Sequence, residues 1–447
     1  MGIVAYDLQN YDDAERDWLL AAHIFDDIGQ PSWGAVVQNE LGLLYRDRGQ
    51  LAAAIDCFEK LIAQREKDGV PDHVGRGLEN IGEIMLFQGR LAAAIATFER
   101  ALQKMKTRVY LVDLYLHLGL AYQAAGALDM AQEQYQKGLD IALEIDRRNA
   151  LPHVYYRLGD IQRRMGNNVA ALVHFEAAAE LIEATRTPIK DEGLKISLLG
   201  RWQQVYEMLV LHCLKMGDVA RAFAWAERAR ARAFADAVAA KRPQSGQAEQ
   251  AFPDTVHLQM ADVQALLPAG GVLLNYFTTG VQRRSIPLLH AIPAHNPLRE
   301  HLVTPARTLL FVVGGDKTAV YTCPIDPNHL TMHSPRGHDP ERLLQTAVLQ
   351  HLHQSLVGIA GAAAQAQRLF IVPHGPLHHV PFAALMEANR HQSPHPAATI
   401  TYAPSATLLT HVLPLDPTPM TGGSCLAVGF NDWGGKRPLR YSEAEAA

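Results

Sequence analysis

Small and aromatic residues recur at a fixed spacing along the first half of the chain. A leucine or isoleucine precedes a glycine, which is followed seven residues later by a second glycine, then after five by an alanine, and after four more by an aromatic residue. The first glycines of the four clear copies are Gly42, Gly82, Gly119 and Gly159. They are spaced by 37 or 40 residues, which indicates a repeat architecture.

Each copy of this pattern predicts a hairpin of two helices. The second glycine marks the end of the first helix, because glycine tolerates the left-handed conformation of a helix cap. The alanine and the aromatic residue are four positions apart and share one face of the second helix. The first glycine lets that face approach closely. A single hairpin cannot bury its apolar face, so neighbouring hairpins are expected to stack into a solenoid.

Weaker copies of the pattern flank the clear ones. At the start, Gly2 and Trp18 fit the template, although the chain begins inside the first helix and this repeat looks cut. At the other end, Gly217 fits after a longer step, with an insertion expected around Thr185–Lys190. The last helix of the array carries Arg228 and Arg232 on one face, and a solvated basic face is the expected role of these residues.

The pattern changes beyond a polar break at Lys241–Gln247. Short apolar or alternating runs predict strands at Val272–Phe277, Thr308–Val313, Thr318–Cys323, Leu369–Pro373 and Cys425–Gly429. The second and third of these flank a turn signal at Gly314–Lys317, and a long helix is expected over Pro340–Gln367. A helix between buried strands favours a parallel α/β core.

Composition narrows the class of protein. The 447 residues are 48% hydrophobic and 19% charged, which excludes a disordered chain. The net charge of −5 gives no support for direct nucleic-acid binding. No apolar run approaches the roughly 18 residues of a membrane span, and the N-terminus lacks a secretory signal, so we expect a cytoplasmic protein.

Cysteine and glycine usage argues against metals and cofactors. The four cysteines, Cys57, Cys213, Cys323 and Cys425, are more than 100 residues apart and form no CxxC pair. A disulfide framework or a zinc site is therefore not expected. No glycine-rich phosphate loop is present either, and the sequence predicts neither a metal nor a cofactor.

The spacing in the first half resembles the tetratricopeptide repeat (TPR) family, whereas HEAT-type repeats share only its period. Segments of the second half resemble, in order, the CHAT domain, a caspase-like module found after TPR arrays: Gln264–Pro268 with Leu273–Phe277, Leu369–Leu385, Tyr402–Ser405 and Leu426–Gly429. The most specific is Leu369–Leu385, where a strand leads into a turn and then a helix. The helix Ala226–Arg232 also looks like the piece that joins the two modules.

The resemblance implies an α-solenoid of TPR hairpins followed by a partial α/β caspase-like domain. The array is expected at 1–240, a linker at 241–255 and an incomplete CHAT domain at 256–447. Solenoids of this kind usually hold a protein or peptide in their groove, so such a ligand is the expected partner. The sequence does not identify the residues that line the groove.

The CHAT resemblance also implies the chemistry of caspase–separase cysteine peptidases. In that family a histidine of a His-Gly pair activates a cysteine at the end of the next strand. Both come after the segment that Leu426–Gly429 resembles, and this chain ends 18 residues later at Ala447. We therefore expect a chain truncated before its catalytic dyad, with no catalytic residue and no peptidase activity.

None of the other histidines and cysteines is expected to replace the dyad. The pair His374-Gly375 is expected to form a tight turn, and Cys425 to be a core residue at the start of a strand. Cys323 is expected to be structural, and His378 and His379 to lie at the surface or at a helix cap rather than to bind a metal. Two functions stay open: a TPR–CHAT protein of peptidase ancestry that is inactive as given, or a scaffold that acts through the TPR groove alone.

Overall fold

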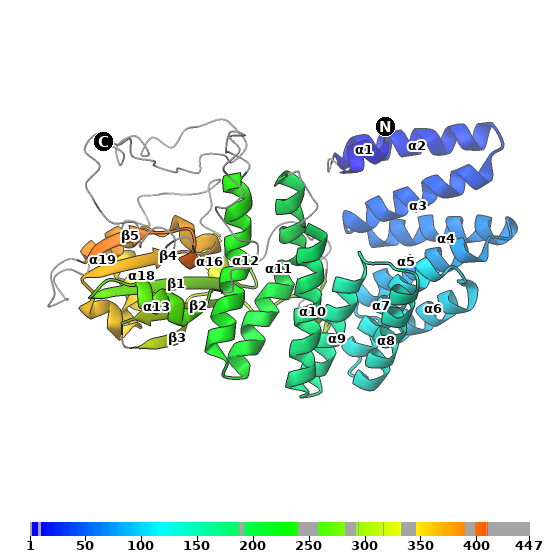
Figure 1. Ribbon diagram of the computed structural model, residues 1–447. Coiled ribbons are helices and arrows are strands. Elements are labelled where there is room, and N and C mark those ends of the chain that lie inside the picture. Colours follow the sequence, from blue (N-terminus) through cyan, green and yellow to red (C-terminus); the bar gives the residue numbers. More distant parts are fainter. Residues whose placement is uncertain are drawn as a thin grey trace, which may run out of the picture.

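The described part of the chain consists of a helical array and a small sheet (Figure 1). The computed structural model describes residues 2–7, 10–186, 192–239, 258–281, 292–331 except 294 and 316, 346–388, 398–407 and 409. The expected linker at 241–255, the expected strand Cys425–Gly429 and the chain end lie outside these residues, as does most of the expected insertion near residue 187. Within the described ranges, no helix combines the length and the apolar character that crossing a bilayer requires.

Twelve helices, paired into hairpins, form the array. They are α1 (Gly2–Asp7), α2 (Tyr11–Asp27), α3 (Pro31–Asp47), α4 (Leu51–Lys67), α5 (Pro71–Phe87), α6 (Leu91–Lys104), α7 (Arg108–Ala124), α8 (Leu128–Glu144), α9 (Leu151–Arg164), α10 (Asn168–Arg186), α11 (Glu192–Lys215) and α12 (Val219–Ala239). The odd-numbered helices are the first helices of the hairpins and the even-numbered ones are the second. The predicted repeat boundaries are confirmed, with a glycine at positive φ at the turn of each complete hairpin.

Each clear hairpin is locked by contact between its first glycine and its aromatic residue. A Cβ atom added at Gly82 would lie 2.5 Å from the ring of Phe98, and one at Gly119 would lie 2.4 Å from the ring of Tyr135. Both rings are fully buried. Gly2 meets Trp18 in the same way, at 2.7 Å. The glycine is therefore required for close helix approach, as the spacing predicted.

The last hairpin exchanges large and small residues at these positions. Val210 stands seven residues before the turn glycine Gly217, where the other hairpins have glycine. Ala226 stands where they have the aromatic residue. Both are fully buried in one apolar cluster. The two side chains together fill a similar volume, but the larger one now lies on the first helix and the smaller one on the second. This exchange explains why the repeat pattern is weak in this part of the sequence.

Five strands form one mixed sheet in the order β3-β2-β1-β4-β5. They are β1 (Gly271–Thr279), β2 (Arg307–Gly314), β3 (Thr318–Cys323), β4 (Arg368–Val372) and β5 (Thr399–Tyr402). The pairs β1–β4 and β4–β5 are parallel, whereas β1–β2 and β2–β3 are antiparallel. The sheet is therefore mixed: β1 and β4 form the expected parallel core, and the predicted hairpin of β2 and β3 joins β1 in antiparallel orientation. The chain leaves β1 and enters β2 at the same end of the sheet, where Thr279 pairs with Arg307.

The expected long helix at 340–367 is only partly helical. Its described residues form α18 (Thr346–His353), a π-helical turn at Gln354–Gly358 and a 3₁₀ turn at Gly361–Gln365. Gly358 and Gly361 interrupt the regular helix, because glycine lowers helix propensity. The remaining short helices are α13 (Met260–Leu266), α15 (Arg299–Leu302), α16 (Pro327–Thr331) and α19 (Phe382–Ala388).

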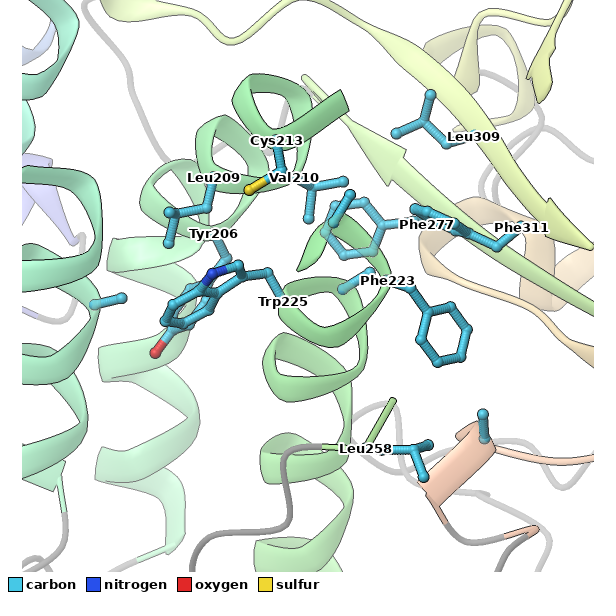
Figure 2. Close-up of a cluster of buried hydrophobic side chains, with 14 of the residues drawn as sticks. Tyr206, Leu209, Val210, Cys213, Phe223, Trp225, Leu258, Phe277, Leu309 and Phe311 are labelled. Atoms are coloured by element: carbon cyan, nitrogen blue, oxygen red, sulfur yellow. The ribbon is translucent and has the colours of Figure 1, made fainter. Parts of the chain in front are cut away.

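Helices cover both faces of the sheet. On one face, α18 and α19 pack against alternate side chains of β1 and β4. On the other face, the last hairpin of the array contributes Phe223, which meets Phe311 of β2 edge-on at 5.7 Å between ring centroids. Figure 2 shows Phe223 beside Phe277 and Phe311, with Val210 and Cys213 of α11 close by. The hairpin α11/α12 therefore belongs to the array and to the core under the sheet.

Candidate functional site

Neighbouring first helices of the array are joined by polar side chains. Each contact links positions about 37 residues apart, so it repeats with the solenoid. The pairs are Arg46–Glu83 at 2.7 Å, His117–Glu79 at 2.9 Å and Gln123–Asp160 at 2.6 Å. They form one row across α3, α5, α7 and α9, and the concave surface of a solenoid is its usual binding face. We call this surface of the first helices the groove.

His117 carries a positive charge in this row at neutral pH. Burial of the ring opposes the charged form, but the hydrogen bond and the charge of Glu79, with help from Glu83 and Asp113, raise the pKa of His117 to about 9. The side chain of Glu79 is 6% exposed and that of His117 is 32% exposed. A charged pair therefore stands in the middle of the groove.

The groove is crossed by the chain segment that connects β1 to β2. We call residues 292–306 the strap. Near its start, the Asn296 side-chain amide donates to the carbonyl of Phe87, the last residue of α5, at 2.9 Å, and also to that of Leu86. Carbonyls at a helix C-terminus lack partners within the helix. The strap therefore caps a first helix about 210 residues earlier in the chain.

His301 anchors the strap between α7 and α9. Its Nδ1 accepts a hydrogen bond from the Gln123 side-chain amide at 3.0 Å, and Arg157 donates to its carbonyl at 2.9 Å. Desolvation, and then the positive charge of Arg164, lower the pKa of His301 to about 4. The ring is 7% exposed and is neutral at pH 7. A neutral ring suits this contact, because Nδ1 must accept the amide proton.

Backbone carbonyls of the strap are also held by the later first helices. Arg164 of α9 donates to the Glu300 carbonyl at 2.9 Å, and Gln204 of α11 donates to the Leu302 carbonyl at 3.1 Å. The side chain of Leu298 is fully buried in the cluster formed by α5 to α7. The strap thus covers the groove from the end of α5 to α11.

The groove also contains a cavity on the N-terminal side of the strap. It has a volume of about 160 Å³, and Val36, Asn39, His73, Arg76 and Tyr110 are among its lining residues. The Arg76 guanidinium stacks over the Tyr110 ring at 4.8 Å from its centroid. Desolvation, and then the charges of Arg65 and Arg76, lower the pKa of His73. This cavity combines apolar, aromatic and cationic walls.

A buried polar cluster ties α12 to the sheet. Arg230 donates to Glu227 at 2.8 Å and to the Asn275 side chain of β1 at 2.5 Å, and it also bonds the Tyr276 carbonyl. Glu227 accepts in turn from the Thr407 backbone N–H at 3.1 Å. Glu227 and Arg230 are 1% and 7% exposed. The sequence analysis missed this cluster; its one local signal was a charged pair three apart on a helix.

The expectation for Arg228 is wrong. Its guanidinium pairs with Glu183 of α10 at 2.5 Å and stacks over the Trp225 ring at 4.5 Å, and the Arg228 side chain is only 19% exposed. The residue therefore packs between helices instead of forming a solvated face. The side chain of Arg232 lies outside the described residues.

The histidine candidates lie around the turn after β4. His374 Nδ1 accepts from the Thr278 backbone N–H at 3.0 Å, and its ring stacks on Phe277 at 4.6 Å. Gly375 has φ +55°, and a Cβ there would come within 2.7 Å of the Thr278 hydroxyl. His378 and His379 end the 3₁₀ turn Gly375–His379. The pair His374-Gly375 thus packs against β1, and the described residues contain no group of three that could hold a metal.

The described cysteines are buried thiols. Burial raises the pKa of Cys57 to about 11 and those of Cys213 and Cys323 to about 12. A thiol with such a pKa stays protonated at neutral pH and is a poor nucleophile. Cys323 ends the edge strand β3 and is 3% exposed. Cys425 lies outside the described residues.

Comparison with known families finds matches in two parts of the chain. Two models described as tetratricopeptide repeats match residues 35–107 and 112–144. A model described as the CHAT domain matches residues 339–447. The chain contains TPR repeats followed by a CHAT domain. The CHAT match begins near α18 and includes β4, α19 and β5.

Individual relatives are distant. The mouse outer dynein arm-docking complex subunit 4 is 25% identical over 146 residues, which is 30% of this chain and only 23% of that protein. Among solved structures, BtubC (BKLC) from P. vanneervenii is 18% identical with a TM-score of 0.42, covering 55% of this chain and 98% of that one. Apo RapI is 11% identical with a TM-score of 0.38, covering 53% and 96%. Because these TM-scores lie below 0.5, nothing about function follows from them.

Proposed function

We propose that this protein is a cytoplasmic TPR–CHAT scaffold whose array binds a protein or peptide at the open end of the groove, formed by α3 and the N-terminal halves of α5 and α7. TPR arrays are protein-binding surfaces. The observation that carries the proposal is the position of the strap. Its contacts lie at the C-terminal ends of α5, α7 and α9 and on α11, so among the described residues the strap leaves α3 and the N-terminal halves of α5 and α7 uncovered.

The chemistry of the open end supports a protein ligand. Trp33 and Val36 of α3 are 57% and 39% exposed, and Val36 lines the cavity together with Arg76 and Tyr110. Tryptophan, tyrosine and arginine are the residues that most often dominate protein interfaces. The 160 Å³ cavity is smaller than the roughly 300 Å³ at which small-molecule sites begin. It has room for one anchoring side chain.

The second part of the proposal is that this chain does not cleave peptides. The CHAT domain gives the second half a peptidase-like fold, but the described cysteines are buried and their thiols are protonated. We place the array at 1–240, the linker at 241–255 and the CHAT portion at 256–447, and we assign no catalytic residue, metal or cofactor. An active cysteine peptidase is the competing function. It would need Cys425 to act as the nucleophile.

Binding can be tested by selecting peptides on the full chain and measuring their Kd by calorimetry. Tyr110→Ala removes an aromatic wall of the cavity and is expected to weaken binding about tenfold or more. Met130→Ala is the matched control, because Met130 is 42% exposed on the second helix α8. Selected peptides that bind both variants equally would place the binding surface elsewhere.

The absence of cleavage needs its own measurement. We expect the full chain to leave a fluorogenic peptide library intact at neutral pH. Cleavage that is lost in Cys425→Ala would refute the scaffold and establish the peptidase. Cleavage that persists in that variant would point to a contaminating protease.

A further inference from the structure

A second and larger pocket lies where the array meets the strap. It has a volume of about 670 Å³ and is bounded by α9, α11 and residues 299–307. Sites for small molecules and cofactors usually measure about 300–1,000 Å³. The strap closes the groove on one side of this pocket through the His301 and Glu300 contacts to α7 and α9. The strap therefore forms one wall of a pocket that is partly open to solvent.

The pocket is strongly cationic in an acidic protein. Five basic side chains and two carboxylates line it, although the whole chain has a net charge of −5. Asp160 pairs with Arg163 at 2.6 Å and with Arg164 at 3.0 Å. Among the described residues, no ion pair neutralises Lys215, Arg299 or Arg307. Concentrated positive charge in a cleft attracts and holds anions.

Two buried polar atoms in the pocket wall have no partner in the described protein. His212 Nε2 donates to the Asn168 carbonyl at 2.8 Å, so its Nδ1 is an acceptor, and this Nδ1 receives no hydrogen bond. Thr304 Oγ1 is likewise unpaired. Their residues are 1% and 3% exposed. Buried polar atoms are normally satisfied, but these two atoms are closed to solvent, so the proposal for the pocket rests on its charge, size and apolar lining.

Apolar and aromatic side chains also line the pocket. They belong to Tyr156, Met208, Leu211, Val303 and Pro305. A simple inorganic anion would leave this surface without contacts. An acidic peptide would need a continuing groove, and the strap blocks it at α9. The combination favours a compact molecule with a charged end and an apolar body.

We propose that this pocket binds an organic phosphate of nucleotide size, with its phosphates near Lys215 and Arg307 and its apolar body against Tyr156 and Met208. This site is separate from the open end of the groove, so it does not depend on the proposed peptide binding. Arg163 and Arg164 are held by Asp160 and shape the wall. Lys215 and Arg307 supply charge that no ion pair among the described residues neutralises.

The test uses the full chain and calorimetric titration with ATP, AMP, adenosine, inorganic phosphate and a hexaglutamate peptide. We expect ATP and AMP to bind, and adenosine and inorganic phosphate to bind at least about tenfold more weakly. The variant Lys215→Gln/Arg307→Gln should weaken ATP binding about tenfold or more. Arg100→Gln/Lys137→Gln removes the same charge from exposed positions of α6 and α8 and should bind normally.

Each other outcome contradicts the proposal. If neither ATP nor AMP binds, or if the two double variants bind ATP equally, the pocket is not a phosphate site. If adenosine binds as tightly as ATP, the basic side chains do not contribute to affinity. If inorganic phosphate binds as tightly as ATP, the apolar wall does not contribute to affinity. Tighter binding of hexaglutamate would identify an acidic peptide as the ligand. Unchanged thermal unfolding of both variants confirms that the comparison reports binding.

Discussion

The array and the sheet are held together in different ways. In the array, every hairpin before the last is held by contact between a glycine and an aromatic residue only 16 positions apart, and this contact recurs from hairpin to hairpin. In the sheet, neighbouring strands come from distant parts of the chain, since β1 begins at Gly271 and pairs with β4 at Arg368. The array therefore depends on many similar local contacts, and the sheet on a few contacts that occur once. A single substitution should harm the sheet side more.

The largest effect is expected at the cluster that joins α12 to β1. Arg230→Met removes the positive charge paired with the buried Glu227 carboxylate, which keeps its hydrogen bonds from Asn275 and Thr407 but loses its counter-charge. We expect the free energy of unfolding to fall by about 3–5 kcal/mol, measured by urea denaturation of the full chain.

The double variant Glu227→Leu/Arg230→Met serves as the control for this loss. It removes both charges, so much of the stability should return. A double variant less stable than Arg230→Met alone would show that the cluster acts through packing and not through its charges.

A smaller effect is expected for one lock of the array. Gly82→Val places a side chain where even a Cβ would lie 2.5 Å from the Phe98 ring. We expect a loss of about 2–3 kcal/mol, because the hairpin must open to accept the added volume. Urea unfolding of the full chain, monitored by tryptophan fluorescence, measures this loss in its first transition.

Gly34→Ala is the matched control for this lock. Gly34 is helical, and an added Cβ would meet no atom within 4 Å. The substitution should therefore stabilise the array by up to about 1 kcal/mol through helix propensity. If both variants lose stability equally, the glycine is needed for the backbone and not for close packing.

The same contrast decides how much of the molecule could be predicted from the sequence. The locks of the array could be predicted because each leaves a glycine and an aromatic residue at fixed spacing. The strands β1 to β4 and the β2–β3 hairpin could be predicted from apolar runs and turn residues, whereas β5 (Thr399–Tyr402) was not predicted as a strand. The antiparallel pairing of β2 with β1 could not be predicted, because it depends on the path of the chain between these two strands.

The candidate site depended even more on contacts distant in sequence. Asn296 and His301 have no distinctive neighbours in the sequence, and their partners Phe87 and Gln123 lie about 180–210 residues earlier. No pattern within one segment could reveal that the strap crosses the groove. The exchange of Val210 and Ala226 concealed the last hairpin in a similar way, since it keeps the volume but loses the motif.

The smallest expected effect concerns pH, and it separates the covered part of the groove from the open part. His301 in the strap has a pKa lowered to about 4, so the folded protein binds fewer protons than the unfolded chain there. The stability that His301 contributes to the folded state is fully present above pH 6.5 and is lost as the pH falls toward 4. His117 has a pKa raised to about 9, so its contribution is present below pH 6.5 and is lost as the pH rises through 9.

Urea unfolding at pH 4.5, 6.5 and 9.5 measures the contributions of both histidines to stability. In His301→Gln, the loss of unfolding free energy between pH 6.5 and 4.5 should be smaller by about 1–2 kcal/mol. In His117→Gln, the loss between pH 6.5 and 9.5 should be smaller by less than about 1 kcal/mol, because the His117–Glu79 pair is partly exposed. His351→Gln, at an exposed position of α18, should change neither side. An acid loss that persists in His301→Gln would show that the strap is not the pH-sensitive element, and that the groove is covered equally well at low pH.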